Sequence, residues 1–315
     1  MIKWVKSRTV MMIQKLSMLL FSCLCITLFL NANESLTHSF EAYHKEAKKG
    51  NVDAMFITGL LYFQGSHIPK DYSKAFEWYD KAAKKGHLEA CNNLAMMYEK
   101  GYGISKNDTL AYQYYFKAAQ GGLVVSMLNL GLFFEKKQTI EHMKQAYEWY
   151  QKAAEKGNSI AQNNLGKLYY FGNGVSLNFQ KAFFWFQEAA WKDDAIAQYN
   201  LSMMYYAGEF VAKDEEKMLF WLQRSAENGS YHAQYKLGDV YTEGNYVTKN
   251  LPEAFQWYLR AAKQEYPKAM YQVGIFYFYG HGVQQNSLEA KSWLAKAVEL
   301  GYEDASVFMQ EHHLR

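Results

Sequence analysis

The chain has 315 residues, of which 17% are aromatic and only 3 are proline, and its formal net charge is +3. So many large apolar side chains and so few prolines exclude a disordered chain and favour packed helices. Two of the 3 cysteines lie in an apolar N-terminal run, which leaves Cys91 without a partner for an internal disulfide.

The first predicted element is an export signal. Four basic residues precede an apolar run at 16–30, and no acidic residue comes before Glu34. This layout is typical of a secretory signal peptide, and the apolar run is shorter than the length that usually spans a membrane. We therefore expect residues 1–32 to be removed after Ala32 and the mature chain to be periplasmic or secreted. The alternative is an uncleaved N-terminal anchor, because Leu30 is bulky where a small residue is preferred.

The positive charge of the chain belongs to this signal. Without residues 1–32 the remainder has a formal charge of −1. A nucleic-acid-binding face shows as clustered lysine and arginine, so we expect no nucleic-acid partner. We also expect no membrane insertion once the signal is removed.

The body of the chain, residues 50–301, is predicted to form seven helix pairs. A capping helix is expected within 33–49, and a second capping helix with a tail at 302–315. In the second helix of each pair, a large aromatic residue recurs at spacings of 35 or 36 residues. These residues are Trp78, Tyr114, Trp149, Trp185, Trp221, Trp257 and Trp293. Small residues share their helical stripe, which lets a neighbouring helix approach, and we expect the tryptophans to be structural.

The first helix of each pair follows the pattern small-x3-Leu-Gly-x2-Tyr-x2-Gly, which is clearest at 161–172. Its first glycine lowers helix propensity, so its recurrence indicates close helix packing. Its last glycine predicts a left-handed helix end. These last glycines are Gly65, Gly101, Gly172, Gly208, Gly244 and Gly280.

An Asn or Asp precedes most of the second helices and is the preferred type of N-cap residue. These residues are Asp71, Asn107, Asn178, Asp214, Asn250 and Asn286. The third pair has His142 at this place and Lys137 instead of the loop glycine, and it is one residue shorter. We therefore expect an irregular connection there.

These motifs, with a Gly-x-Gly-Val loop and Lys-Ala-x2-Trp-x3-Ala-Ala, resemble the Sel-1-like repeat, a relative of the tetratricopeptide repeat. The resemblance covers roughly residues 39–311. It implies an all-α fold, a right-handed α/α superhelix or solenoid of helix-turn-helix repeats of about 36 residues. It also implies that the first helices line a concave side and that the protein is an adaptor for a protein or peptide.

Two positions per repeat face the groove if the tetratricopeptide arrangement holds. The first set is Phe56, Asn92, Leu128, Asn163, Tyr199, Tyr235 and Tyr271, and the second is Phe63, Glu99, Glu135, Tyr170, Tyr206, Thr242 and Phe278. Aromatic residues are enriched at protein interfaces and accumulate here in the C-terminal half. The candidate partner-binding residues are therefore Tyr170, Tyr199, Tyr206, Tyr235, Tyr271 and Phe278. The alternative is that these rings fill space between successive first helices.

The sequence carries no recognised catalytic motif. It lacks Ser-x2-Lys, Gly-x-Ser-x-Gly, Gly-x4-Gly-Lys-Ser/Thr and His-Glu-x2-His. We expect no enzyme activity, cofactor or metal: the adjacent His312 and His313 point in different directions on a helix, and Cys91 reads as a packing residue. The alternative function is a cell-wall enzyme of the family's cysteine-rich, β-lactamase-linked branch, whose paired cysteines this chain lacks.

Overall fold

The structure is a computed structural model that describes residues 40–66 and 68–314. The expected signal or anchor at 1–32, and the start of the expected N-terminal cap, lie outside the described residues. Within them the chain forms 16 α-helices and no strand. None of these helices is both long enough and apolar enough to cross a bilayer. The all-α, solenoid fold class is confirmed.

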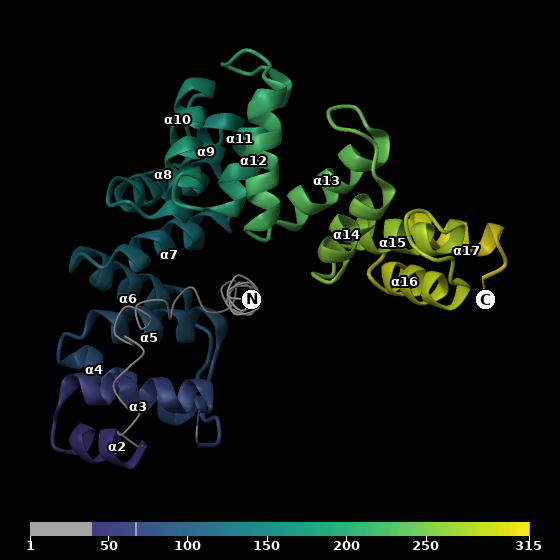
Figure 1. Cartoon of the computed structure of the whole chain (residues 1–315). Coiled ribbons are helices and arrows are strands. Elements are labelled where there is room, and N and C mark those ends of the chain that lie inside the picture. The colour runs from purple at the N-terminus through teal and green to yellow at the C-terminus, as the bar shows by residue number, and fades with distance from the viewer. Residues whose placement is uncertain (1–39, 67, 315) are drawn as a thin grey trace, which may run out of the picture. The chain divides into compact units, whose positions relative to one another are not determined.

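The helices belong to two compact units. The first unit reaches Leu168 and also includes 172–176, while the second consists of 169–171 and the residues from Leu177 onward. In each unit, consecutive helices pack against one another in chain order (Figure 1). The first unit contains α2 (Phe40–Lys48), α3 (Val52–Gln64), α4 (Tyr72–Lys84), α5 (Leu88–Lys100), α6 (Asp108–Gln120), α7 (Val124–Glu135), α8 (Ile140–Glu155) and most of α9 (Ser159–Phe171). The second contains α10 (Phe179–Ala190), α11 (Ala195–Ala207), α12 (Glu215–Glu227), α13 (Tyr231–Glu243), α14 (Leu251–Ala262), α15 (Pro267–Tyr279), α16 (Ser287–Glu299) and α17 (Glu303–Glu311).

The helix ends lie where the sequence predicts them. The six glycines at the ends of first helices adopt the left-handed conformation, with φ between 70° and 77°. The six Asn and Asp residues before second helices are N-caps, and each accepts a hydrogen bond from a backbone N–H of the first turn. These bonds satisfy donors that a helix start otherwise leaves unpaired.

The third pair has the irregular connection that its sequence predicts. Helix α7 ends at Glu135 without a left-handed glycine, and Gln138 has φ 52° instead. Thr139 is the N-cap of α8, and its hydroxyl accepts from the backbone N–H of His142 at 3.3 Å. His142 therefore lies inside the helix, which begins two residues before it, at Ile140, with Thr139 as its cap.

The recurring aromatics of the second helices are less buried than expected. Trp78, Trp221 and Trp257 are buried, but Tyr114, Trp149, Trp185 and Trp293 are only half-buried. The residue that follows each of them is at most 2% exposed. These buried residues are Tyr79, Tyr115, Tyr150, Phe186, Leu222, Tyr258 and Leu294. One residue is about 100° of helix rotation, so the residue after the recurring aromatic faces the first helix.

A cation covers the outer face of many of these aromatic rings. Lys152 Nζ lies 4.1 Å from the Trp149 ring centroid, and the Arg260 guanidinium carbon lies 4.2 Å from that of Trp257. The cation stands three residues after the ring, one helical turn on, and the contact adds a cation–π attraction. Ring faces that the core does not cover are therefore shielded by the helix's own lysine or arginine.

The glycine in the middle of the first helix is required by close helix approach, as predicted. A Cβ atom placed on Gly131 would lie 2.3 Å from a ring carbon of Tyr150, and one on Gly238 would lie 2.4 Å from a ring carbon of Tyr258. Both distances are well inside van der Waals contact. The glycine thus makes room for the buried ring of its own helix pair.

Side-chain hydrogen bonds also join each pair to the next. The Nε2 atoms of Gln162, Gln198 and Gln234 donate to the carbonyl oxygen of the last alanine of the preceding second helix, at 3.0 to 3.2 Å. Cys91 occupies the same position, and its Sγ lies 4.0 Å from the carbonyl oxygen of Ala83. The same carbonyls accept from backbone N–H groups that follow the helix, so the glutamine of the next repeat adds a second hydrogen bond at the end of the preceding second helix.

Candidate partner-binding face

Three of the six candidate residues occupy the same register on successive first helices of the second unit. Tyr199 lies on α11, Tyr235 on α13 and Tyr271 on α15. Each ring contacts the start of the next first helix or its N-cap: the centroid distances are 5.7 Å from Tyr199 to His232, 5.5 Å from Tyr235 to Tyr266 and 5.4 Å from Tyr271 to Tyr302. All three tyrosines remain only half-buried. The rings therefore fill space between helices and still present surface to solvent.

A carboxylate lies among these tyrosines. The Tyr258 hydroxyl donates to Asp239 Oδ1 at 2.8 Å, and Lys236 Nζ lies 3.7 Å from Asp239 Oδ2. Burial raises the pKa of Asp239. Burial and then the Asp239 charge raise the pKa of Tyr199, and that of Tyr235 to about 12.

Tyr266, the N-cap of α15, completes this group. Burial raises its pKa, with smaller contributions from Tyr199 and Asp239 among others. We call Tyr199, Tyr235, Asp239, Tyr258 and Tyr266 the tyrosine–Asp239 cluster. Its hydroxyl groups and its carboxylate, which pairs with Lys236, make it a polar part of an otherwise aromatic face.

Tyr206 lies near this cluster beside a small pocket. It is 47% exposed, and together with Asp239 and Lys236 it lines a pocket of about 50 Å³. Its side chain is hydrogen-bonded to that of Tyr246, which follows α13. Pockets for drug-sized ligands span several hundred Å³, so this one suits water or the tip of a side chain.

Tyr170 and Phe278 are engaged elsewhere in the second unit. The Tyr170 ring lies 5.3 Å from that of Phe179, and burial together with a hydrogen bond to Glu209 raises its pKa to about 12. Phe278 lies 5.2 Å from the Phe308 ring of α17. Both rings thus contact residues outside the tyrosine–Asp239 cluster, and the structure does not bring all six candidates into one site.

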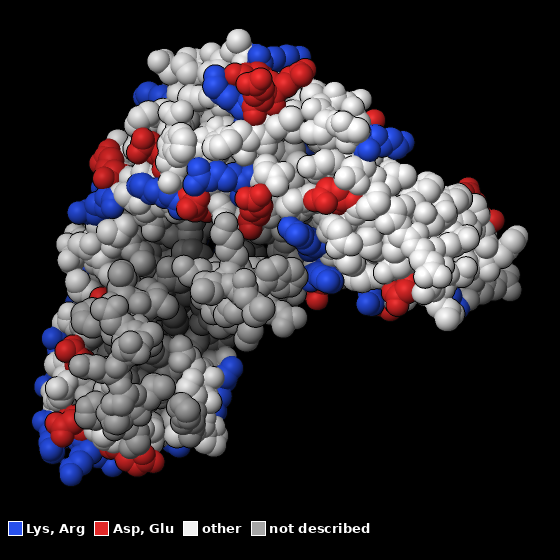
Figure 2. All heavy atoms as spheres, in the orientation of Figure 1, with Lys and Arg blue, Asp and Glu red and all other residues white. Residues whose placement is uncertain are grey.

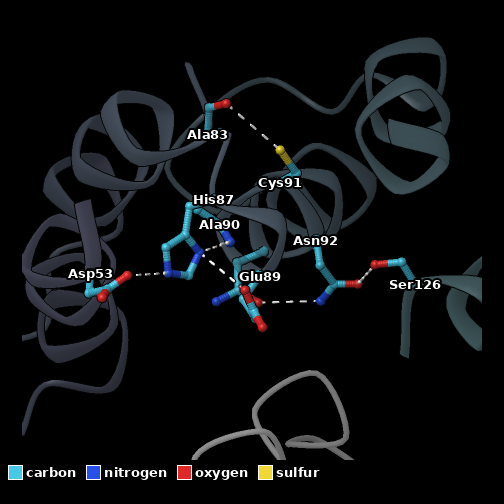
Figure 3. Close-up of polar contacts among 9 residues, drawn as sticks. Asp53, Ala83, His87, Glu89, Ala90, Cys91, Asn92 and Ser126 are labelled. Atoms are coloured by element: carbon cyan, nitrogen blue, oxygen red, sulfur yellow. Dashed lines mark hydrogen bonds and ion pairs between the residues drawn. The ribbon is translucent and has the colours of Figure 1, made fainter. Parts of the chain in front are cut away.

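The corresponding positions of the first unit are mostly closed. Asn92, Leu128 and Asn163 are 2%, 2% and 3% exposed, so the prediction that they face an open groove is wrong. Asn92 Oδ1 accepts from Ser126 Oγ at 2.9 Å (Figure 3). It also accepts from Asn129 Nδ2 at 2.8 Å. Because these side chains are short or form hydrogen bonds across helices, the next first helix packs over them.

His87 and Cys91, which lie near each other in the sequence, do not form a catalytic pair. His87 Nδ1 accepts from the backbone N–H of Ala90 at 3.2 Å, so this histidine is the N-cap of α5 (Figure 3). The Cys91 thiol points to the Ala83 carbonyl, and burial raises its pKa. Activated cysteines have lowered pKa values, so the environment of Cys91 is that of a packing residue.

Sequence reasoning missed Asp239, although the repeats contain a signal for it. It directly follows the Leu-Gly pair, at a position where only one other repeat has a charged residue, Lys167. The remaining repeats have Leu60, Met96, Leu132, Met203 and Ile275 there. A carboxylate at a position that is otherwise apolar marks a departure from what repeat packing requires.

Charges elsewhere on the surface are mixed. On the face shown in Figure 2, basic and acidic side chains lie beside one another on both units and form no tract of one sign. Among residues 40–66 and 68–314, no three His, Cys, Asp or Glu side chains gather as a metal site.

The fold and its repeated helix pairs define a class, that of the α/α-repeat proteins, and the comparison with known families makes the assignment specific. The Sel1 repeat model matches residues 52–87, 88–123, 124–158, 159–193, 195–230, 232–266 and 267–302. The chain belongs to the Sel1 repeat family, whose members are generally protein-interaction scaffolds.

Solved structures agree with this assignment. A Sel1 repeat protein from Oxalobacter formigenes is 31% identical, with a TM-score of 0.75 over 86% of this chain and 80% of that one. The protective antigen c5321 of uropathogenic Escherichia coli, which has an SLR fold, is 31% identical, with a TM-score of 0.66 over 88% of this chain and 60% of its own length. Yeast Tom70, at 16% identity and a TM-score of 0.52 over 86% of this chain and 57% of that one, shares the fold alone. The comparison with curated proteins finds no match.

Proposed function

We propose that this protein is an exported adaptor that holds a partner polypeptide on the first helices of its second unit. The observation that carries the proposal is the tyrosine–Asp239 cluster. Tyr199 and Tyr235 keep solvent-exposed surface at a register where three repeats of the first unit have the buried Asn92, Leu128 and Asn163, and one has the half-buried Phe56. Since asparagine or leucine satisfies the packing at this register, packing alone does not require tyrosine.

The chemistry of the cluster favours a partner segment that contains lysine or arginine. Tyrosine rings offer rigid contact area at a low cost in side-chain entropy, and their faces attract cations. Asp239 adds a carboxylate in a partly desolvated setting, where a charge-assisted hydrogen bond is stronger than in water. A basic side chain inserted between Tyr199 and Tyr235 would meet both groups.

Export is supported by the four basic residues and the apolar run at 16–30, which precede the first described helix. Under this proposal the mature chain meets its partner in the periplasm or outside the cell. The near-neutral charge of the mature chain is consistent with a protein partner and gives no support for a nucleic-acid one.

The test is affinity capture with residues 33–315 in the native host, comparing the unchanged chain with Tyr199→Ser/Tyr235→Ser/Tyr271→Ser. We expect the triple variant to lose a partner that the unchanged chain retains, because the aromatic contacts are removed. Asp239→Asn should lose the same partner, since it removes the charge and keeps the shape of the side chain. Captured proteins are identified by mass spectrometry.

A matched control changes exposed residues outside the proposed face. Gln113→Ser/Gln256→Ser changes two exposed positions of the second helices and should retain the partner. Thermal melting of every variant separates loss of binding from loss of fold. If the tyrosine triple unfolds the chain while Asp239→Asn still captures everything, the rings are packing residues and the proposed face is refuted.

A further inference from the structure

The repeats of this chain can be compared with one another, and the repeat at 159–193 has an unusual set of three apolar residues in and directly beside its second helix. It has Leu177, Phe184 and Trp191 there. At the place of Leu177 other repeats have Lys70, Lys106, Lys213, Lys249 and Gln285. At the place of Phe184 they have Glu77, Gln113, Glu148, Gln256 and Ser292, and the next repeat has Phe220. At the place of Trp191 they have Lys84, Gln120, Glu155, Glu227, Lys263 and Glu299.

These three side chains are largely exposed: Phe184 and the C-cap residue Trp191 lie on one face of α10, and Leu177 directly precedes the N-cap Asn178. Leu177, Phe184 and Trp191 are 56%, 50% and 57% exposed. Phe184 and Trp191 are seven residues apart, which is close to two helical turns or about 10 Å along the axis. We call the three residues the α10 stripe. Phe220, at the matching position of α12, is also 50% exposed, and the Trp191 ring packs 4.8 Å from that of Trp221.

The charges beside the stripe are also unusual. Lys181 is exposed on the first turn of α10, and Glu188 lies two turns further along. The other six repeats have a lysine or arginine at the position of Glu188. These residues are Lys81, Lys117, Lys152, Arg224, Arg260 and Lys296. The outer side of α10 is thus basic at its start and acidic near its end.

The apolar residues and the flanking charges of α10 form a self-complementary surface. If two α10 helices lie antiparallel about a twofold axis at Phe184, Leu177 of each copy, which directly precedes the N-cap, comes near Trp191 at the helix end of the other. Lys181 of each copy then lies opposite Glu188 of the other. A twofold interface must pair one surface with an identical copy of itself, and an antiparallel helix with apolar ends and opposite flanking charges meets that condition.

We infer that the α10 stripe is the contact between two copies of this chain, packed antiparallel through α10. A lipid surface fits less well, because segments that lie on membranes are flanked by cations alone, whereas the α10 stripe is flanked by both signs. Exposed apolar side chains that cluster in this way, instead of lying singly, are typical of interaction sites.

The first experiment is sedimentation equilibrium of residues 33–315, which include every described helix, from about 1 to 100 µM. We expect a dimer. The variant Leu177→Lys/Phe184→Gln/Trp191→Glu installs residues that the other repeats already have, so its circular dichroism should match that of the unchanged chain. Its melting temperature should fall only slightly, through loss of the Trp191–Trp221 ring contact. Its dimer dissociation constant should rise at least about a hundredfold, since aromatic anchors at an interface centre dominate binding.

The control for this variant is Leu288→Glu, which changes another exposed apolar residue of the second unit, 82% exposed on α16. It should leave the dimer unchanged. The second experiment reverses the flanking charges. Lys181→Glu alone and Glu188→Lys alone should each weaken the dimer, and the two together should restore it, because each copy then again offers opposite charges.

A chemical cross-link tests the position of the twofold axis. Phe184→Cys should form a disulfide between copies on mild oxidation, while Leu288→Cys should not. A monomer over the whole concentration range would overturn the inference, as would a dimer that the triple variant leaves intact. Pelleting of the unchanged monomer with anionic phosphatidylglycerol vesicles, lost in the triple variant, would assign the stripe to a membrane surface and equally overturn it.

Discussion

Asp194 combines a capping role with an unfavourable environment for its charge. It is the N-cap of α11, and its Oδ1 accepts from the backbone N–H of Ala197 at 2.9 Å. Burial raises its pKa to about 6, partly offset by hydrogen bonds from backbone N–H groups. The folded chain therefore binds a proton at Asp194 below about pH 6, whereas the unfolded chain does so near pH 4. Stability gained from this proton is present below pH 4 and is lost as the pH rises through 6.

We predict that Asp194→Asn stabilises the protein at pH 7.5. Asparagine is already the cap at the matching positions Asn51 and Asn158, and it carries no charge to bury. The full pKa shift corresponds to about 3 kcal/mol, and partial exposure of the side chain reduces the expected gain to about 2 kcal/mol. Melting at pH 7.5 and at pH 4 measures it, and the gain should vanish at pH 4.

Asp214 is the matched control for Asp194. It also caps a helix, but its hydrogen bonds with Lys217 lower its pKa, so its charge is favourable in the folded state. Asp214→Asn should therefore give no gain at pH 7.5. An equal gain for Asp194→Asn at both pH values would show that burial of charge is not its cause.

At the residue scale, the sequence predicts what depends on neighbours along the chain. The caps and left-handed glycines follow from residue type and position, and the structure confirms them. The partial exposure of Trp149 and Trp185 was not predictable in this way, because it depends on the rotation of each second helix against its neighbours. That rotation turns Tyr150 and Phe186 into the core instead.

At the element scale, the separation of the two helices in a pair is set by a glycine facing a ring. We predict that Gly238→Ala destabilises the protein by about 1–2 kcal/mol, although alanine is the better helix former. The new methyl group would meet the Tyr258 ring, which would have to shift. In another repeat Ala95 and Tyr115 occupy the matching positions and are both buried, so such a shift is possible. Chemical unfolding of the variant measures the loss.

A compensating change tests the reason for this loss. In the neighbouring repeat Ser202 and Leu222 stand where Gly238 and Tyr258 do, and both are buried. Tyr258→Leu should therefore make Gly238→Ala harmless, so that the double variant is no less stable than Tyr258→Leu alone. If the two losses simply add, the methyl group does not act through the ring.

The candidate face is also a property of elements and not of single residues. The sequence places Tyr199, Tyr235 and Tyr271 in one register, and the structure puts them on successive first helices. The sequence could not show that the rings of Tyr170 and Phe278 pack against other rings, because those contacts come from α10 and α17. Their exposure depends on helices whose packing the repeat motif leaves open.

For the whole molecule, stability is distributed along the chain, since the main contacts join consecutive helices. Trp257→Ala should remove about 3–5 kcal/mol, because the ring is only 3% exposed. We predict that hydrogen exchange measured by mass spectrometry rises in α13 to α15 and stays unchanged in α3 to α6. Trp293→Ala, at a half-buried ring, should have a smaller effect. A uniform rise along the chain would show a single cooperative fold.

The glutamines that cap the preceding second helix bear on how such a chain can lengthen. Gln162, Gln198 and Gln234 each bind the last alanine carbonyl before them, whereas Met127 and Met270 stand at the same place in two other repeats and have no amide to donate. If a duplicated repeat were inserted ahead of a glutamine, its last alanine carbonyl would accept the side-chain hydrogen bond in addition to the backbone one. Ahead of a methionine it would keep the backbone hydrogen bond alone. Gene duplication should therefore be tolerated unequally along the array, most readily in its central part.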